Sequence, residues 1–257
     1  MIETQPNSTI SEEQEAFDVF LPIMEQWCKE TLPTLQLQWQ KYGHIDQKTF
    51  TSLGALGVLG VIADPQWGGL GLSMWHQIML MKTLSFYCPS LGLSYLAHAH
   101  LCLSQIQRFG RLDQKQRYLP GLIQGAHIGA LAISETHAGS DACSMKLKAE
   151  RKGTQFCLNG HKFWITNAPI ADVFVVYAVT DPSKGKNGIS AFIIERNTPG
   201  FSISKPINKI GMKTSPTAEL IFDNCWVDES QLLGELNQGV YIMMKGLDYE
   251  RLTLSAG

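Results

Sequence analysis

The chain has 257 residues, of which 44% are hydrophobic and 17% charged, and its formal net charge is −2. This length suffices for two domains, and the composition is that of an ordinary globular core. The small net charge and the lack of a run rich in Lys and Arg argue against a nucleic-acid partner. No apolar stretch is long enough to cross a bilayer.

The cysteines and the first residues bear on the cellular compartment. The six cysteines are scattered without a CxxC pair, which predicts reduced thiols in a cytosolic-type compartment. The polar, acid-containing start lacks the basic and apolar regions of a signal peptide, and it is not an Arg-rich transit peptide. We therefore expect a cytoplasmic protein, or one of the mitochondrial matrix if the source is eukaryotic.

The first half of the chain has the apolar spacing of helices. Ser11 to Gln14 has the spacing of a capping box, and apolar residues from Phe17 to Cys28 then recur on one face. Pro65 to Gly71 is a cluster of helix breakers and predicts a loop. Further helices are expected at residues 46–56, 74–88, 91–108 and 113–124.

The second part predicts strands, followed by the start of another helix. Asn159-Gly160 separates two apolar runs and predicts a tight hairpin turn between strands at 155–158 and 161–166. Other strands are expected at 128–134, 145–150, 173–179, 189–194 and 219–222, and a helix from about Gln238. The order predicts an α+β chain of several domains: an N-terminal all-α helical domain (1–127), a middle β domain (128–233) and the start of a C-terminal helical domain (234–257).

Glu250 is the strongest candidate for a catalytic group. Val240, Met243, Met244, Leu247 and Leu254 recur at helical spacing, and the glutamate borders this apolar face. Apolar surroundings disfavour an ionised carboxylate and raise its pKa, as a general base near neutral pH requires. The alternative is an inert Glu at the edge of an amphipathic helix.

Two further segments carry weaker signals. Glu135 to Asp141 follows a strand without regular spacing, and Gly139 would allow unusual backbone angles or the close approach of a ligand; a plain turn is the alternative. Trp164 and Thr166 alternate along a strand and therefore share a face, where they could hold a planar heteroaromatic ring. A core Trp beside a Thr is equally compatible with this pattern.

A metal site is not expected. His98 and His100 form an H-x-H pair, but no carboxylate or Cys stands nearby at ligand spacing. We interpret both as ordinary residues of an apolar helix.

Taken together, these segments resemble the acyl-CoA dehydrogenase family. Leu131 to Asp141 and Leu158 to Asn167 are similar to its two flavin-site signatures, and the similarity runs from about residue 11 to the end. The segment Gly246 to Leu252 resembles the isovaleryl-type branch, in which the catalytic glutamate stands on this helix in a Glu-Arg-Leu context. Glu250 occupies that position.

The resemblance implies a middle β-barrel domain, FAD as cofactor, an acyl-CoA substrate with a short branched chain, and electron-transfer flavoprotein as electron acceptor. Glu250 would remove the α-proton, while flavin N5 takes the β-hydrogen as hydride. Flavin contacts would come from Leu131, Ala132, Ile133, Ser134, Gly139, Ser140, Trp164, Ile165 and Thr166. Substrate contacts would come from Ser140, Tyr241, Asp248 and Arg251.

Two departures from the family pattern set further expectations. Thr136-His137 replaces the usual Pro-x, which predicts a looser loop. The chain also ends where the family's C-terminal four-helix bundle begins, so we expect a truncated form. In the family, that bundle supplies a donor to the thioester carbonyl and most of the interface of a homotetramer or homodimer. A non-catalytic flavin-binding or scaffold subunit, and an oxidase acting on non-thioesters, remain as alternatives.

Overall fold

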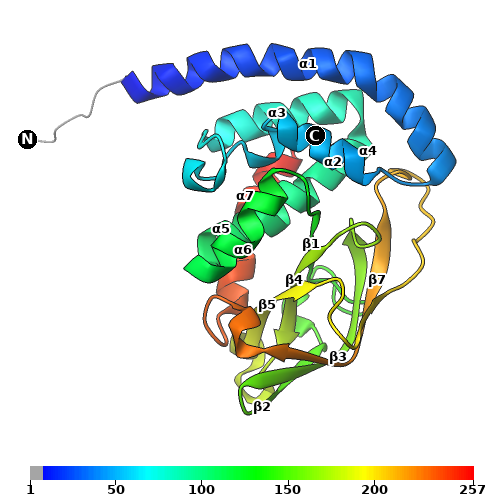
Figure 1. Ribbon diagram of the computed structural model, residues 1–257. Helices are drawn as coiled ribbons and strands as arrows, with labels where there is room; N and C mark the ends of the chain where they lie inside the picture. Colours follow the sequence, from blue (N-terminus) through cyan, green and yellow to red (C-terminus); the bar gives the residue numbers. More distant parts are fainter. Residues whose placement is uncertain (1–7) are drawn as a thin grey trace, which may run out of the picture.

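The computed structural model describes residues 8–257, and its helices and sheet form two layers (Figure 1). The helical elements are α1 (Ser8–Tyr42), α2 (Gln47–Ala55), α3 (Met74–Tyr87), α4 (Pro89–Tyr95), η3 (Leu96–Leu103), α5 (Ser104–Phe109) and α6 (Leu112–Ile123), with short 3-10 turns η1 (Val58–Gly60) and η2 (Pro65–Trp67). The strands are β1 (Gly129–Ala132), β2 (Lys148–Lys152), β3 (Gln155–Thr166), β4 (Val173–Val179), β5 (Ile189–Glu195), β6 (Phe201–Ile203), β7 (Thr217–Asp228) and β8 (Leu232–Leu233). Helix α7 (Gly239–Leu254) is the last element; the remaining 3-10 segments are η4 (Ala142–Ser144), η5 (Pro182–Gly188), which is kinked at Gly185, and η6 (Glu229–Gln231).

The helical half largely follows the predicted pattern. Asp46 caps α2 by accepting a hydrogen bond from the Thr49 backbone N–H at 2.9 Å. The predicted start of the first helix at Ser11 is wrong, because helical backbone already begins at Ser8. From Pro89 to Phe109 the chain is helical throughout, and its middle part, η3, winds as a π-helix. π-helical segments are rare in proteins, and those that occur often lie at functional sites.

The strands form one eight-stranded sheet in the order β6-β7-β3-β2-β4-β5-β8, with β1 pairing in parallel with β4. The expected barrel is wrong, because the end strands β6 and β8 do not pair with each other and the sheet stays open. Within the described residues, β6 pairs only with β7 and β8 pairs only with β5. β4 is buried on both faces: Val173, Val175 and Tyr177 enter one apolar cluster, while Phe174 and Val176 enter the other.

The hairpin turn predicted at Asn159-Gly160 is also wrong. β3 runs unbroken through both residues, and the turn from β2 lies at Gly153, whose φ is +65°. Gly160 instead marks an irregularity in the pairing of β3 with β7, at a φ of +137°. The long pairing with β7 therefore overrides a local turn preference and converts it into a bulge.

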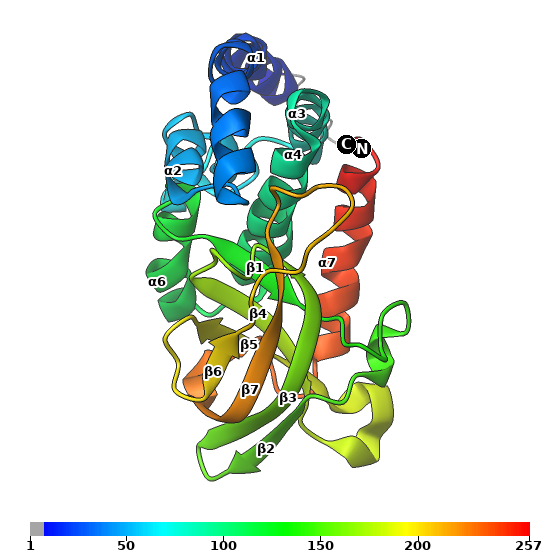
Figure 2. The ribbon, with the colours of Figure 1, turned by 90° about the vertical axis from the view of Figure 1, so that its right-hand side faces the viewer.

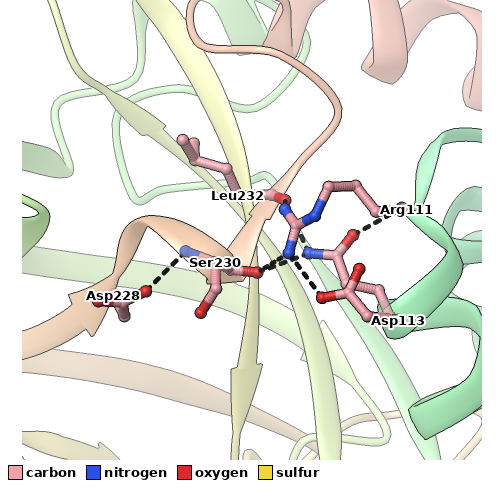
Figure 3. A network of polar contacts seen from close by, with 6 residues as sticks. Arg111, Asp113, Asp228, Ser230 and Leu232 are labelled. Carbon is pink, nitrogen blue, oxygen red and sulfur yellow. Dashed lines mark hydrogen bonds and ion pairs between the residues drawn. The ribbon is translucent and has the colours of Figure 1, made fainter.

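A polar network fixes α6 against the end of the sheet (Figure 3). The Arg111 guanidinium donates to the Ser230 carbonyl at 2.7 Å and pairs with Asp113 at 3.0 Å. The Asp228 carboxylate accepts from the Ser230 backbone N–H at 2.9 Å, which holds the β7–β8 connection in place. This contact anchors the helical layer on the sheet.

Helix α7 returns from the sheet to the helical layer and lies alongside it (Figure 2). It contacts η3, α3, α5 and β5. The last residue reaches α3, since a side chain added at Gly257 would meet Ser85 and Met81. Within residues 8–257, no helix combines the length and apolar character needed to span a membrane.

Candidate functional site

A pocket of about 180 Å³ lies where β1, the end of β3, η3 and α7 meet. It brings together six of the residues that the two sequence signatures predicted, along with three from the surrounding helices. Its lining consists of Ala97, Leu101, Leu131, Ile133, Ser134, Trp164, Ile165, Thr166 and Leu247. The lining side chains are apolar apart from the hydroxyl groups of Ser134 and Thr166 and the indole N–H of Trp164, so a flat apolar group with a polar edge would suit them.

The backbone at Trp164 is unusual. Its φ is +62°, and the pairing of β3 with β7 shifts register between Lys162 and Ile165. A positive φ is a genuine outlier for a bulky side chain and costs on the order of 1–3 kcal/mol. The indole is nevertheless 56% exposed. The regular alternation expected for Trp164 and Thr166 is therefore broken, although both still line the same pocket.

The loop after β1 shows which of its residues reach the pocket. Ala132 points away and is buried in the other apolar cluster, as alternation along β1 requires. Gly139 and Ser140 are exposed and do not line the pocket. The unusual backbone angle expected at Gly139 is not present, because its φ is not positive. A Cβ at Gly139 would meet no protein atom within 4 Å, so the close approach of a ligand there stays a prediction.

The loop expected to be looser is closed by two backbone hydrogen bonds. The Glu135 N–H donates to the Ala138 carbonyl at 2.9 Å, and the Ala138 N–H donates back at 3.2 Å. His137 Nε2 also lies 3.4 Å from the Glu135 carboxylate. These bonds give the segment a defined shape without the usual proline.

Glu250 lies on the inward side of α7. The buried positions of this helix are Gly239, Ile242, Met243, Gly246 and Thr253. Glu250 follows Gly246 by four residues and precedes Thr253 by three, so it stands in this row. The predicted apolar face is wrong in part, because Met244 and Leu254 are exposed and Gly246 and Thr253 are buried instead.

The environment of Glu250 shifts its pKa in the direction that sequence reasoning expected. The carboxylate is half-buried, and burial raises its pKa above the ordinary value, while the adjacent Arg251 works in the opposite direction. Leu247, one turn before Glu250, lines the pocket. A carboxylate of raised pKa thus stands one helical turn from the pocket wall.

The proposed substrate contacts on α7 lie outside this pocket. Tyr241, Asp248 and Arg251 are exposed, and Tyr241 packs edge-on against Phe109 at 6.0 Å between ring centroids. Their assignment as substrate-binding residues stays a prediction.

Sequence reasoning missed the residues that hold α7 in place. A Cβ added at Gly246 would come within 2.4 Å of Gln105 Nε2, so the helix approaches α5 closely there. Gln105 Oε1 in turn accepts a hydrogen bond from the Tyr177 hydroxyl at 2.5 Å. Arg108 donates to the Lys245 carbonyl at 3.1 Å and stacks over Tyr249. Only the three-dimensional structure reveals these contacts, because all the partners are distant in sequence.

The two histidines of η3 are structural. His98 is buried; its Nδ1 accepts from the Gly129 N–H at 2.9 Å, and its Nε2 donates to the Leu122 carbonyl at 3.0 Å. Burial lowers the pKa of His98 to about 4, so the ring is neutral. His100 Nδ1 contacts Gln77 at 3.2 Å. Among residues 8–257, no group of three or more His, Cys, Asp or Glu side chains could hold a metal ion.

Comparison with known proteins assigns the chain to a family. The model of the acyl-CoA dehydrogenase N-terminal domain matches residues 11–126, and the model of the middle domain of the same family matches residues 130–225. The mitochondrial isovaleryl-CoA dehydrogenase of Pongo abelii is 53% identical over 207 residues, which are 80% of this chain and 49% of that protein. The chain thus spans about half the length of the curated relatives it matches.

Solved structures agree with this assignment. Butyryl-CoA dehydrogenase from Megasphaera elsdenii superposes with a TM-score of 0.88 at 32% identity, covering 100% of this chain and 66% of that one. An acyl-CoA dehydrogenase from Bacillus anthracis, solved in complex with FAD, superposes with a TM-score of 0.85 at 33% identity, covering 96% of this chain and 42% of that one. With both its helical and its sheet domain matched, the chain belongs to the acyl-CoA dehydrogenase family.

Proposed function

We propose that this chain carries the flavin-facing wall and the catalytic base of an FAD-dependent acyl-CoA dehydrogenase that acts on a short branched acyl-CoA. The observation that carries this proposal is the position of Glu250, which stands in the buried row of α7 one turn beyond the pocket residue Leu247. A base of raised pKa beside a pocket of this shape suits the removal of a weakly acidic α-proton.

The residues present fit a flavin ring. The exposed Trp164 indole offers a flat face, and its strained backbone is the kind of outlier that accompanies ligand sites. Leu131, Ile133 and Ile165 supply apolar contact, and the half-buried Thr166 hydroxyl supplies a donor for a polar ring edge. When bound, FAD would accept the β-hydrogen of the substrate as hydride.

The protein's own residues would contribute three effects. Glu250 would accept the α-proton, and burial raises its pKa above the ordinary value, which makes the carboxylate a stronger proton acceptor. The apolar lining from Leu131, Ile133 and Leu247 would exclude water from the reacting atoms. Ser140, on the exposed loop after β1, would contact the acyl-CoA at the outer side of the site.

The substrate class and the partners rest on the family relationship. The similarity to isovaleryl-CoA dehydrogenases and the Glu-Arg-Leu context of Glu250 support a short branched acyl group. Electron-transfer flavoprotein would accept the electrons, and a homotetramer or homodimer would be the assembled form. A non-catalytic flavin-binding or scaffold subunit is the alternative. Such a subunit would use the same flavin-facing residues but would not need Glu250 to act as a base.

Flavin reduction separates these possibilities. A protein that joins this chain to the C-terminal segment of an isovaleryl-CoA dehydrogenase should bind FAD, and anaerobic isovaleryl-CoA should bleach the flavin band. Butyryl-CoA, which is unbranched, should bleach it more slowly. FAD binding without bleaching by any acyl-CoA would support the non-catalytic alternative, and failure to bind FAD would refute the proposal.

A further inference from the structure

Lys162 is fully buried in β3, an unusual place for a charged side chain. Its exposure is 0%, and burial lowers its pKa to about 8, although the neighbouring Glu135 carboxylate opposes that change. The ammonium contacts Glu135 Oε1 at 2.9 Å, the Ile133 carbonyl at 2.8 Å and Met145 Sδ at 3.5 Å. Each of its three N–H groups therefore has an acceptor, which a buried ammonium requires.

Glu135 is equally well satisfied. Its carboxylate accepts hydrogen bonds from the backbone N–H groups of Lys146 at 2.7 Å and Leu147 at 3.0 Å, in addition to the one from Lys162. Burial alone would raise the pKa of this carboxyl, but Lys162 and the two backbone donors outweigh that effect and hold it below the ordinary value. The two side chains therefore form a charged pair inside the protein.

The pair stands directly behind the pocket. Lys162 binds the residues on both sides of Ser134, through the Ile133 carbonyl and the Glu135 side chain. The next residue of β3, Phe163, donates its N–H to the Ser134 carbonyl at 2.8 Å. Two consecutive residues of β3 thus fix three consecutive residues after β1. The pocket residue Trp164 follows immediately on the strand side.

Stability alone does not explain such an arrangement. Replacing a buried ion pair with apolar groups of similar size is often neutral or stabilising, whereas removing one partner is strongly destabilising. A pair of this kind therefore gives weak evidence for a stability role. Its contacts hold the two walls of the pocket in a fixed relation, and binding sites depend on such supporting contacts.

We propose that Lys162 and Glu135 are positioning residues for the flavin, which lock the loop at Ile133 and Ser134 onto the strand that carries Trp164 and Thr166. Neither Lys162 nor Glu135 lines the pocket, so both would act through the residues they hold. This inference rests on the proposed function, because it requires that the pocket binds a flavin.

The test uses the protein in which this chain is joined to the C-terminal segment, with FAD as the probe, and compares Lys162→Met, Glu135→Gln and the double variant with that parent. Arg151→Met is the matched control, since Arg151 lies on the neighbouring strand β2 and pairs with Glu229 of η6 at 2.9 Å on the protein surface. Trp fluorescence quenching reports FAD affinity, the visible flavin band reports the ring environment, and thermal melting reports stability. Each single variant should melt earlier, because it leaves an unpaired buried group.

The double variant separates positioning from stability. The double variant should recover most of the melting temperature that the single variants lose. It should still bind FAD at least roughly tenfold more weakly than the parent, with a shifted flavin band. Arg151→Met should leave the melting temperature and the FAD affinity unchanged. A double variant that melts like the parent and also binds FAD like the parent would overturn the inference. Failure of the parent itself to bind FAD would overturn the proposed function, and this inference with it.

Hydrogen exchange on the parent protein gives a second test that needs no variant. The amides of Phe163 and Leu147 report on the contacts of Ser134 and Glu135, because each donates to one of these residues. If breaking these contacts releases the flavin, FAD at about 100 times its dissociation constant should slow exchange of both amides by about 100-fold. An unchanged exchange rate at saturating FAD would show that the contacts of Lys162 and Glu135 are not coupled to the flavin site, and would contradict the proposal.

Discussion

Adjacent methionines on α7 give a matched test of how this helix docks. Met243 is fully buried in the apolar cluster that includes Ile242, whereas Met244 is 37% exposed. Truncating each to Ala removes the same atoms from neighbouring positions of one helix. Intrinsic helix propensity changes almost equally in the two variants and cancels in the comparison.

The burial of each side chain sets the size of the effect. Truncating a fully buried Met to Ala costs about 2–5 kcal/mol, which combines lost apolar burial with the cavity left behind. Met244→Ala should cost less than about 1 kcal/mol, because its partly exposed side chain leaves no enclosed cavity. The two variants should therefore differ by about 2 kcal/mol, and Met243→Ala should be the less stable.

Urea unfolding followed by tryptophan fluorescence measures this difference directly. Both variants should keep the parent's slope against urea, and only the midpoint of Met243→Ala should fall substantially. Equal losses, or a larger loss for Met244→Ala, would mean that α7 docks through another face. Glu250 would then stand outside the buried row, and the argument for its raised pKa would fail.

The remaining predictions concern the buried pair and the exposed side of α7. Lys162→Met should cost about 3–5 kcal/mol in urea unfolding, and adding Glu135→Gln should recover most of this loss. Because the pKa of Glu135 is lowered in the folded state, its carboxylate adds stability above the pKa of the unfolded state, and this stability is lost as pH falls through the pKa of the folded state. Glu135→Gln should therefore weaken the fall of the urea-unfolding midpoint at acid pH. Leu252 and Met244 are exposed apolar residues on one helix, and exposed apolar surface drives self-association. Leu252→Lys should therefore lower the degree of self-association in ultracentrifugation and the binding of a hydrophobic dye. Unchanged values of both would mean that this surface does not drive association.

Local patterns in the sequence predicted the elements well because their cause is local. Apolar spacing in the first half reflects one-sided burial of helices, and the uninterrupted apolar run of β4 reflects a strand buried on both faces. The signatures at 131–134 and 164–166 also met at one pocket, as the family resemblance implied.

Features that depend on distant partners could not be predicted. Asn159-Gly160 has the local chemistry of a turn, but pairing with β7 holds it inside a strand. Lys162 would be placed at the surface by its charge, since its partner Glu135 lies 27 residues away in the sequence. Met243 and Met244 differ by one helical position, and only packing against η3 and β5 decides which of them is buried.

Replacement of Glu250 by Gln tests the central claim most directly. The change keeps the shape and hydrogen bonding of the side chain but removes the proton acceptor. In the protein joined to a C-terminal segment, we expect the variant to bind FAD and acyl-CoA nearly as the parent does, because the loss falls on the chemical step. Glu235→Gln, which removes an exposed carboxylate before α7, is the control and should retain parent activity. The account predicts that isovaleryl-CoA no longer bleaches the flavin of Glu250→Gln; bleaching at near the parent rate would place the base elsewhere and contradict it.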